Sequence, residues 1–232
     1  MGHSIISMEL VAMLIAQLPN LELIRIRNPF IYEAGFGPFL AESLPALNVS
    51  SLPFLKTLGI SVFTPSILEL ATNLEVLNIQ SCSIPRPVPP MPNLKVVRIA
   101  NRALTEEHLQ NLLSSCTGNL RVFVYLAAID TLDTRGYRRS SDRFRLGGAV
   151  SHLYPRRHSL QSLHLDLRAE NVAQIRDIGD VRPESRLKSF TTLENLLLST
   201  NVVPFPSGQM APSLDSLGER LPPVHRIASR CT

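Results

Sequence analysis

Residues 74–84 have the sequence Leu74-Glu75-Val76-Leu77-Asn78-Ile79-Gln80-Ser81-Cys82-Ser83-Ile84. Leucine or isoleucine stands at the first, fourth, sixth and last positions, and a cysteine stands at the ninth. The same spacing returns with asparagine at the ninth position in Leu193-Glu194-Asn195-Leu196-Leu197-Leu198-Ser199-Thr200-Asn201-Val202-Val203. Two copies of one pattern indicate a structural repeat in which each copy supplies a short strand and a tight corner.

Weaker copies of the pattern fill the rest of the chain. Their first leucines are Leu21, Leu55, Leu94, Leu120, Leu160 and Leu214. Because repeats of this length class usually take about 20–29 residues, the longer steps between copies must contain insertions. We expect inserted loops near residues 30–52, 131–146 and 168–189.

Helix signals lie between the expected strands. Thr105 is a suitable N-cap, because Glu106 and Glu107 follow it and favour the positive end of the helix dipole. Leu104 and Leu109 are placed to pack around that cap as a hydrophobic staple. One face of this helix then holds Leu109, Leu112, Leu113 and Cys116.

Two further helices are predicted nearer the N-terminus. Thr64-Pro65 should open a short helix through Leu70, because proline is tolerated at the first helical position. A helix is also expected over residues 7–18, as the outer segment of a repeat.

The pattern resembles that of leucine-rich-repeat proteins, and in particular the repeat region of fungal F-box-type proteins. Four phrases carry the second likeness: Leu18-Pro19-Asn20-Leu21-Glu22, Leu52-Pro53-Phe54-Leu55-Lys56-Thr57-Leu58, Met91-Pro92-Asn93-Leu94-Lys95 and His158-Ser159-Leu160-Gln161-Ser162-Leu163. The F-box itself, which docks the ligase adaptor, is not visible in the sequence. The resemblance implies an α/β leucine-rich-repeat solenoid with a curved parallel sheet and outer helices or irregular segments. We expect one such domain over residues 1–221 and a poorly structured tail over residues 222–232.

The resemblance assigns structural roles to the repeat positions. Alternate apolar residues of each strand should point into a shared core. In the two complete copies these are Leu74, Leu77, Ile79, Leu193, Leu196 and Leu198. Cys82 and Asn201 occupy the corner position, where a side chain satisfies backbone groups.

The strand residues between the inward leucines should face the concave side of the sheet, which is the expected partner-binding face. These residues are Arg25, Arg27, Asn78, Gln80, Arg98, His164 and Asp166. Arginine favours planar, bidentate recognition of carboxylates and phosphates, so an acidic protein or peptide ligand is compatible with this face. The alternative is that these are solvated strand residues without a binding role.

A second basic cluster lies in the loop 135–145. It contains Arg135, Arg138, Arg139, Arg143 and Arg145, interleaved with Tyr137 and Phe144. Arginines with aromatic residues can hold single-stranded RNA by charge and stacking. Asp133 and Asp142 dilute the positive charge, so a solvated loop is the favoured interpretation.

The sequence predicts no enzyme activity, no cofactor and no metal site. No nucleophile-elbow, phosphate-loop or zinc-protease motif is present. His152, His158 and His164 are spaced by six residues, which does not place them on one helix face. Three scattered cysteines fit a reducing compartment, so we expect a cytoplasmic or nuclear protein, and no apolar run predicts a membrane span.

These observations predict that the chain is a non-catalytic protein–protein recognition module. The resemblance implies substrate selection for an SCF-type ubiquitin ligase, with ligase subunits as partners if an F-box exists upstream. The alternatives are a stand-alone leucine-rich-repeat scaffold and, less favoured, RNA binding through the loop 135–145.

Overall fold

The chain is described here by a computed structural model. It describes residues 2–18, 20–26, 43–61, 65–80, 84, 87–101, 105–127, 146–166 and 186–198.

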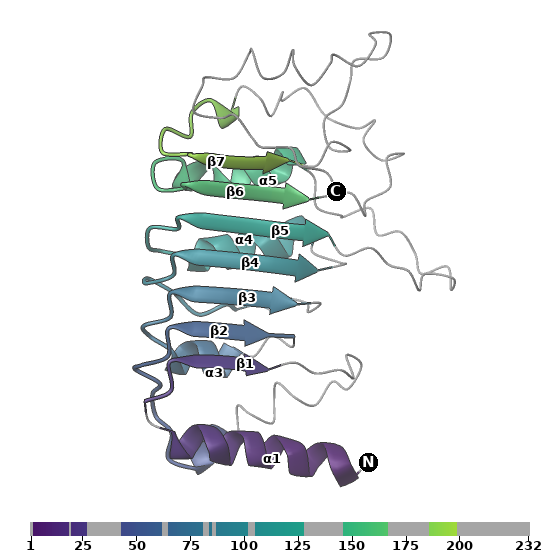
Figure 1. Cartoon of the computed structure of the whole chain (residues 1–232), viewed down its shortest axis with the longest axis vertical. Helices are drawn as coiled ribbons and strands as arrows, with labels where there is room; N and C mark the ends of the chain where they lie inside the picture. The colour runs from purple at the N-terminus through teal and green to yellow at the C-terminus, as the bar shows by residue number, and fades with distance from the viewer. Residues whose placement is uncertain are drawn as a thin grey trace, which may run out of the picture.

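The fold is α/β and is built on one seven-stranded parallel sheet. The strands follow one another in chain order, so each strand pairs with the next strand of the sequence (Figure 1). They are β1 (Leu23–Ile26), β2 (Thr57–Ile60), β3 (Val76–Gln80), β4 (Val96–Asn101), β5 (Val122–Ala127), β6 (Ser162–Asp166) and β7 (Asn195–Leu198). The sequence predicts one strand in each repeat copy, and each observed strand begins two residues after the first leucine of its copy. The copy at Leu214 lies outside the described residues.

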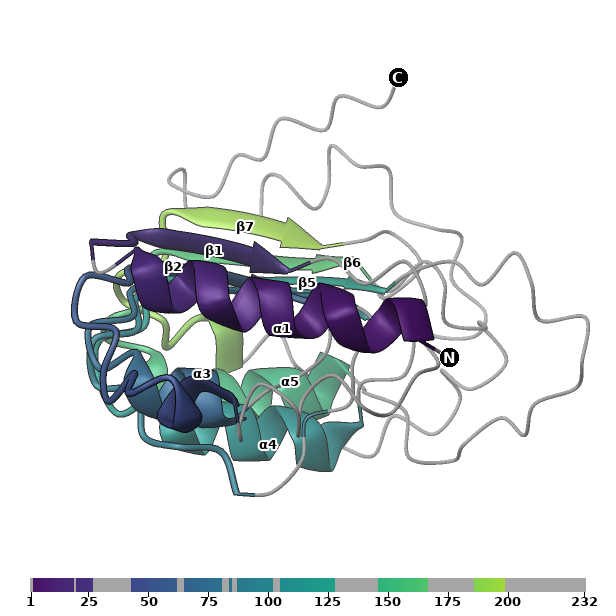
Figure 2. The same cartoon turned by 90° about the horizontal axis from the view of Figure 1, so that it is seen from below.

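Helices lie on one side of this sheet. They are α3 (Pro65–Leu70), α4 (Glu106–Ser115) and α5 (Leu146–Leu153), and a 3-10 turn, η1 (Tyr154–Arg156), follows α5. Figure 2 shows α3, α4 and α5 together below the sheet. No described helix covers the opposite side of the sheet, which we call the helix-free face. A longer helix, α1 (Gly2–Gln17), lies at the end of the sheet beside β1 (Figure 1).

The predicted helix starts agree with the structure at two of three places. Thr105 caps α4, because its hydroxyl oxygen accepts a hydrogen bond from the backbone N–H of His108 at 3.2 Å. Helix α3 begins at Pro65, as expected for proline in the first turn. Helix α1 begins at Gly2, earlier than the predicted residue 7. The proposed staple residue Leu104 lies outside the described residues.

A single hydrophobic core joins the sheet to the helices. Leu77, Val97 and Leu196, from β3, β4 and β7, belong to one cluster with Leu112 of α4 and Val150 of α5. The prediction of one shared apolar interior is therefore confirmed. The physical reason is the strand period of two, which turns alternate side chains of every strand toward the same helices.

The ends of the three predicted inserted loops contribute to structure. Residues 43–46 form one helical turn, and Leu44 and Leu52 are both buried in the core. Leu146, at the end of the second loop, begins α5. Leu187, at the end of the third, packs against the core. The central parts of these loops and the tail 222–232 lie outside the described residues.

Candidate partner-binding face

The register of the parallel strands aligns one residue of each strand into a row across the helix-free face. This middle row consists of Arg25, Gly59, Asn78, Arg98, Val124, His164 and Leu197. On either side of each member, the neighbouring strand residue points into the core, as Leu77 and Ile79 do beside Asn78. The members therefore point away from the helices.

Arg25 lies across the neighbouring strand. A Cβ atom built on Gly59 would stand 3.2 Å from Arg25 Cγ and 3.7 Å from Arg25 Nε. The arginine stem therefore passes over Gly59, where the missing side chain leaves room for it. This directs the side chain of Arg25 from β1 toward the middle of the sheet.

The side chain of Arg98 extends in the opposite direction, from β4 toward β1. Its Nη1 donates to Asn78 Oδ1 at 3.5 Å, so the guanidinium group reaches from β4 onto β3. Gly59 and Asn78 are register partners on the adjacent strands β2 and β3. The two arginines thus converge over this pair, although their backbones are about 14 Å apart at the usual strand spacing.

A second row on the same face is mainly apolar at its centre. It consists of Leu23, Thr57, Val76, Val96, Val122, Ser162 and Asn195. Val76, Val96 and Val122 are half-buried, and Leu23 at the β1 edge is exposed. The converging arginines therefore border a strip of valines, so that charged and apolar groups are adjacent on this face.

The remaining predicted face residues are spread more widely. Gln80 is exposed at the end of β3. His164 and Asp166 are half-buried on β6, and both make polar or electrostatic interactions. They are separated from Arg98 by β5, where Val124 occupies the middle row. The structure therefore groups Arg25, Asn78 and Arg98 and leaves His164 and Asp166 apart; Arg27 lies outside the described residues.

Of the predicted structural positions, Leu74, Leu77, Ile79, Leu193 and Leu196 are buried in the core. Leu198 is half-buried and packs against the same cluster. Cys82 and Asn201 lie outside the described residues, so their corner role stays a prediction.

A row of charges at the strand starts was not predicted. The residue after the first leucine of each copy alternates in sign over Glu22, Lys56, Glu75 and Lys95. Lys95 Nζ lies 2.9 Å from Glu75 Oε1, and Lys56 Nζ lies 3.8 Å from Glu22 Oε1. The hydrogen bond from Lys95 lowers the pKa of Glu75, as do the charges of Lys95 and Lys56, against a smaller opposing effect of desolvation. The alternation is visible in the sequence once the copies are aligned.

A second row, also unpredicted, consists of polar residues that lie two positions before the charged residues. Asn93 Nδ2 donates to the carbonyl of Thr72 at 3.0 Å, and Asn73 Nδ2 donates to that of Pro53 at 2.8 Å. Ser159 and Thr192 hold the equivalent positions in later copies, and each hydroxyl also donates to a backbone carbonyl. The polar residue before the first leucine therefore ties together the turns that precede the strands.

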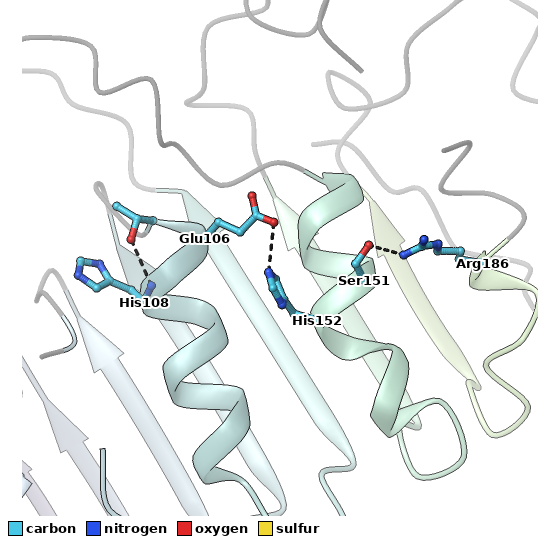
Figure 3. Close-up of polar contacts among 6 residues, drawn as sticks. Glu106, His108, Ser151, His152 and Arg186 are labelled. Atoms are coloured by element: carbon cyan, nitrogen blue, oxygen red, sulfur yellow. Dashed lines mark hydrogen bonds and ion pairs between the residues drawn. The ribbon is translucent and has the colours of Figure 1, made fainter. Parts of the chain in front are cut away.

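The polar contacts between α4, α5 and the segment before β7 are the other candidate for chemistry (Figure 3). His152 Nε2 lies 3.1 Å from Glu106 Oε1. The hydroxyl of Ser151 accepts a hydrogen bond from Arg186 Nη1. Figure 3 shows the side chains of Ser151 and His152 directed to opposite sides of α5, so they do not form a nucleophile–base pair. These contacts tie outer segments to one another.

The other sequence features are less informative. The three histidines that are spaced by six residues occupy separate places: His152 on α5, His158 beside Thr191 Oγ1 at 3.1 Å, and His164 on β6. Within the part of the chain that the structure describes, no three His, Cys, Asp or Glu side chains are grouped to hold a metal ion. The arginine loop 135–145 lies outside the described residues.

None of the described helices combines the length and apolar character needed to cross a bilayer. In the comparisons with known proteins, no protein-family model, curated protein or solved structure matches this chain.

Proposed function

We propose that this chain is a leucine-rich-repeat solenoid whose helix-free face recognises an acidic segment of another protein, without catalysis. The observation that carries the proposal is the convergence of Arg25 and Arg98 over Gly59 and Asn78. Two arginine side chains that extend toward each other over adjacent strands form a favourable position for a carboxylate, because each guanidinium offers a planar fork of N–H donors.

The repeated register supports the solenoid assignment. Seven strands pair in chain order, and both the polar row containing Asn93 and the charged row containing Glu75 recur from strand to strand. Proteins built from such stacked repeats commonly bind partners along the extended face of their sheet. The valine strip beside the arginines adds apolar surface, which an acidic segment with interspersed hydrophobic residues would cover.

The proposed process is substrate selection for an SCF-type ubiquitin ligase. Its support is the likeness of phrases such as Met91-Pro92-Asn93-Leu94-Lys95 to the repeats of fungal F-box-type proteins. Affinity purification from the native cell separates this role from a stand-alone scaffold. Ligase adaptor subunits should co-purify with the protein if it selects substrates, whereas a scaffold would capture partners without them.

The binding face itself is tested by charge reversal. Arg25→Glu and Arg98→Glu should each reduce capture of the same set of proteins, and that capture should weaken as ionic strength rises. Lys188→Glu is the matched control, because Lys188 is exposed in the turn before β7 and lies off the face. Identical capture by all variants that melt like the native protein would contradict the proposed face.

A further inference from the structure

Helix α1 has apolar side chains both on the side that packs against the core and on the side exposed to solvent. Ala12 and Ile15 are buried in the core, and Val11 packs against it. Outside the core, Leu10, Met13, Leu14 and Leu18 are between 47% and 56% exposed. Their spacing places them along one stripe of the helix and its first following residue, because residues three and four apart share a helix face. We call these four residues the outer stripe.

Helix α4 shows what the solvent side of a covering helix in this chain looks like. Its inner residues Leu109 and Leu112 are buried, whereas Glu107, Gln110 and Ser114 are exposed and polar. A helix at the surface of a globular protein normally has one apolar stripe, and a helix that is apolar all round is normally covered. The outer stripe of α1 therefore has the composition of a contact surface.

The position of α1 suits contact with another molecule. It lies at the end of the sheet beside β1, apart from α3, α4 and α5 (Figures 1 and 2). A molecule that docks on the outer stripe there leaves the helices on the other side of the sheet undisturbed.

The absence of charge on the outer stripe limits the kinds of molecule that could bind there. Residues 10–18 contain no ionisable side chain, and α1 contains no lysine or arginine. A helix that binds a membrane surface typically carries basic residues on its polar face, which α1 lacks. Within residues 10–18, a charged partner would find no side chain of opposite charge. The partner must itself present a neutral apolar surface, and the described structure contains one such helical surface, which is the outer stripe.

We propose that two copies of this chain associate through α1, with the outer stripe of one copy packed on that of the other around a two-fold axis. Such an isologous contact requires a self-complementary surface, and an uncharged leucine-rich stripe meets its own copy without like-charge repulsion. Four side chains form a small contact compared with the roughly 800 Å² per partner of a standard interface. We therefore expect a weak dimer that dissociates as the protein is diluted.

The test is sedimentation velocity of the full chain over a wide range of protein concentration. The native protein should shift from monomer to dimer as concentration rises. The double variant Met13→Glu with Leu14→Glu should stay monomeric, because burial of two carboxylates in the contact is unfavourable. Leu126→Glu is the matched control, since Leu126 is an exposed leucine on β5, and it should dimerise like the native protein. Thermal melts identify any variant that fails to fold.

Cross-linking gives an independent measurement that does not depend on the double variant. Met13 lies near the middle of the outer stripe, so Met13→Cys in a background lacking Cys82 and Cys231 should form an interchain disulfide. Leu126→Cys in the same background should not. A native protein that is monomeric at every concentration would overturn the proposal, as would dimerisation that survives the double variant. Flotation of the native chain with phosphatidylcholine vesicles, lost in the double variant, would also overturn it.

Discussion

His152 Nε2 lies 3.1 Å from Glu106 Oε1 and thereby joins the C-terminal part of α5 to the first turn of α4. Gly148, four residues before His152, shares its face of α5. A Cβ atom built on Gly148 would stand 2.6 Å from Glu106 Oε1. The carboxylate therefore occupies space that only glycine leaves open at this position.

This arrangement predicts a measurable coupling between the two helices. In a double-mutant cycle of Glu106→Ala and His152→Ala, we expect a coupling energy of about 0.5 kcal/mol in urea unfolding, because the pair is only partly buried. Gly148→Ala should remove most of this coupling by displacing the carboxylate. A cycle that closes without coupling in the native background would show that the contact does not contribute to stability.

The N-cap of α4 should be important for stability. Thr105→Ala removes the hydroxyl oxygen that accepts from the His108 N–H, so we expect the free energy of unfolding to fall by about 1 kcal/mol. Thr72→Ala is the control, because Thr72 is exposed and does not precede a helix. Equal unfolding midpoints for the two variants would argue against the cap.

The polar row at the turns predicts a cost for losing its side-chain amides. Asn93→Ala leaves the carbonyl of Thr72 without its 3.0 Å donor, and we expect a loss of about 1 kcal/mol in chemical unfolding. Asn195→Ala, at an exposed strand position on β7, should change stability much less. The reverse order of these two effects would be inconsistent with a structural role for the row.

Cys116 should resist thiol reagents in the folded protein. Burial raises the pKa of its thiol to about 12 from an ordinary value of 9.0, so almost no reactive thiolate forms near neutral pH. Iodoacetamide followed by peptide mass spectrometry should find Cys116 unmodified until denaturant is added. The folded state keeps this proton between pH 9 and pH 12 while the unfolded state loses it. Stability should therefore fall as the pH rises through that range.

The charged row predicts a pH effect of opposite sign. Because the pKa of Glu75 is lowered in the folded state, its stabilising effect is present above the ordinary value of 4.5 and is lost as the pH falls through the folded-state pKa. Lys95→Met removes the hydrogen bond and the nearest charge, so the carboxyl pKa should rise toward 4.5 in an NMR titration. An unchanged titration curve would mean that the 2.9 Å contact is not maintained in solution.

Local patterns in the sequence were sufficient for the strands and the core. The alternation of Leu77 and Ile79 with Asn78 predicts a strand with one buried side, because side-chain direction along a strand depends only on the period of two. The Thr105 cap was equally visible, since a cap is a contact between residues three positions apart. The rows containing Asn93 and Glu75 were also present in the sequence, but their meaning depends on aligning the copies.

Only the tertiary structure decided which residues meet across those copies. Arg25 and Arg98 converge because Gly59 and Asn78 are register partners on the two strands between them. That register is a property of how neighbouring strands pair, and no single segment determines it. The contact of Glu106 with His152 and the exposure of the outer stripe of α1 likewise depend on how separate elements pack. Period and capping are short-range properties that one segment carries alone, whereas contacts between segments are set by the balance of packing over the whole core.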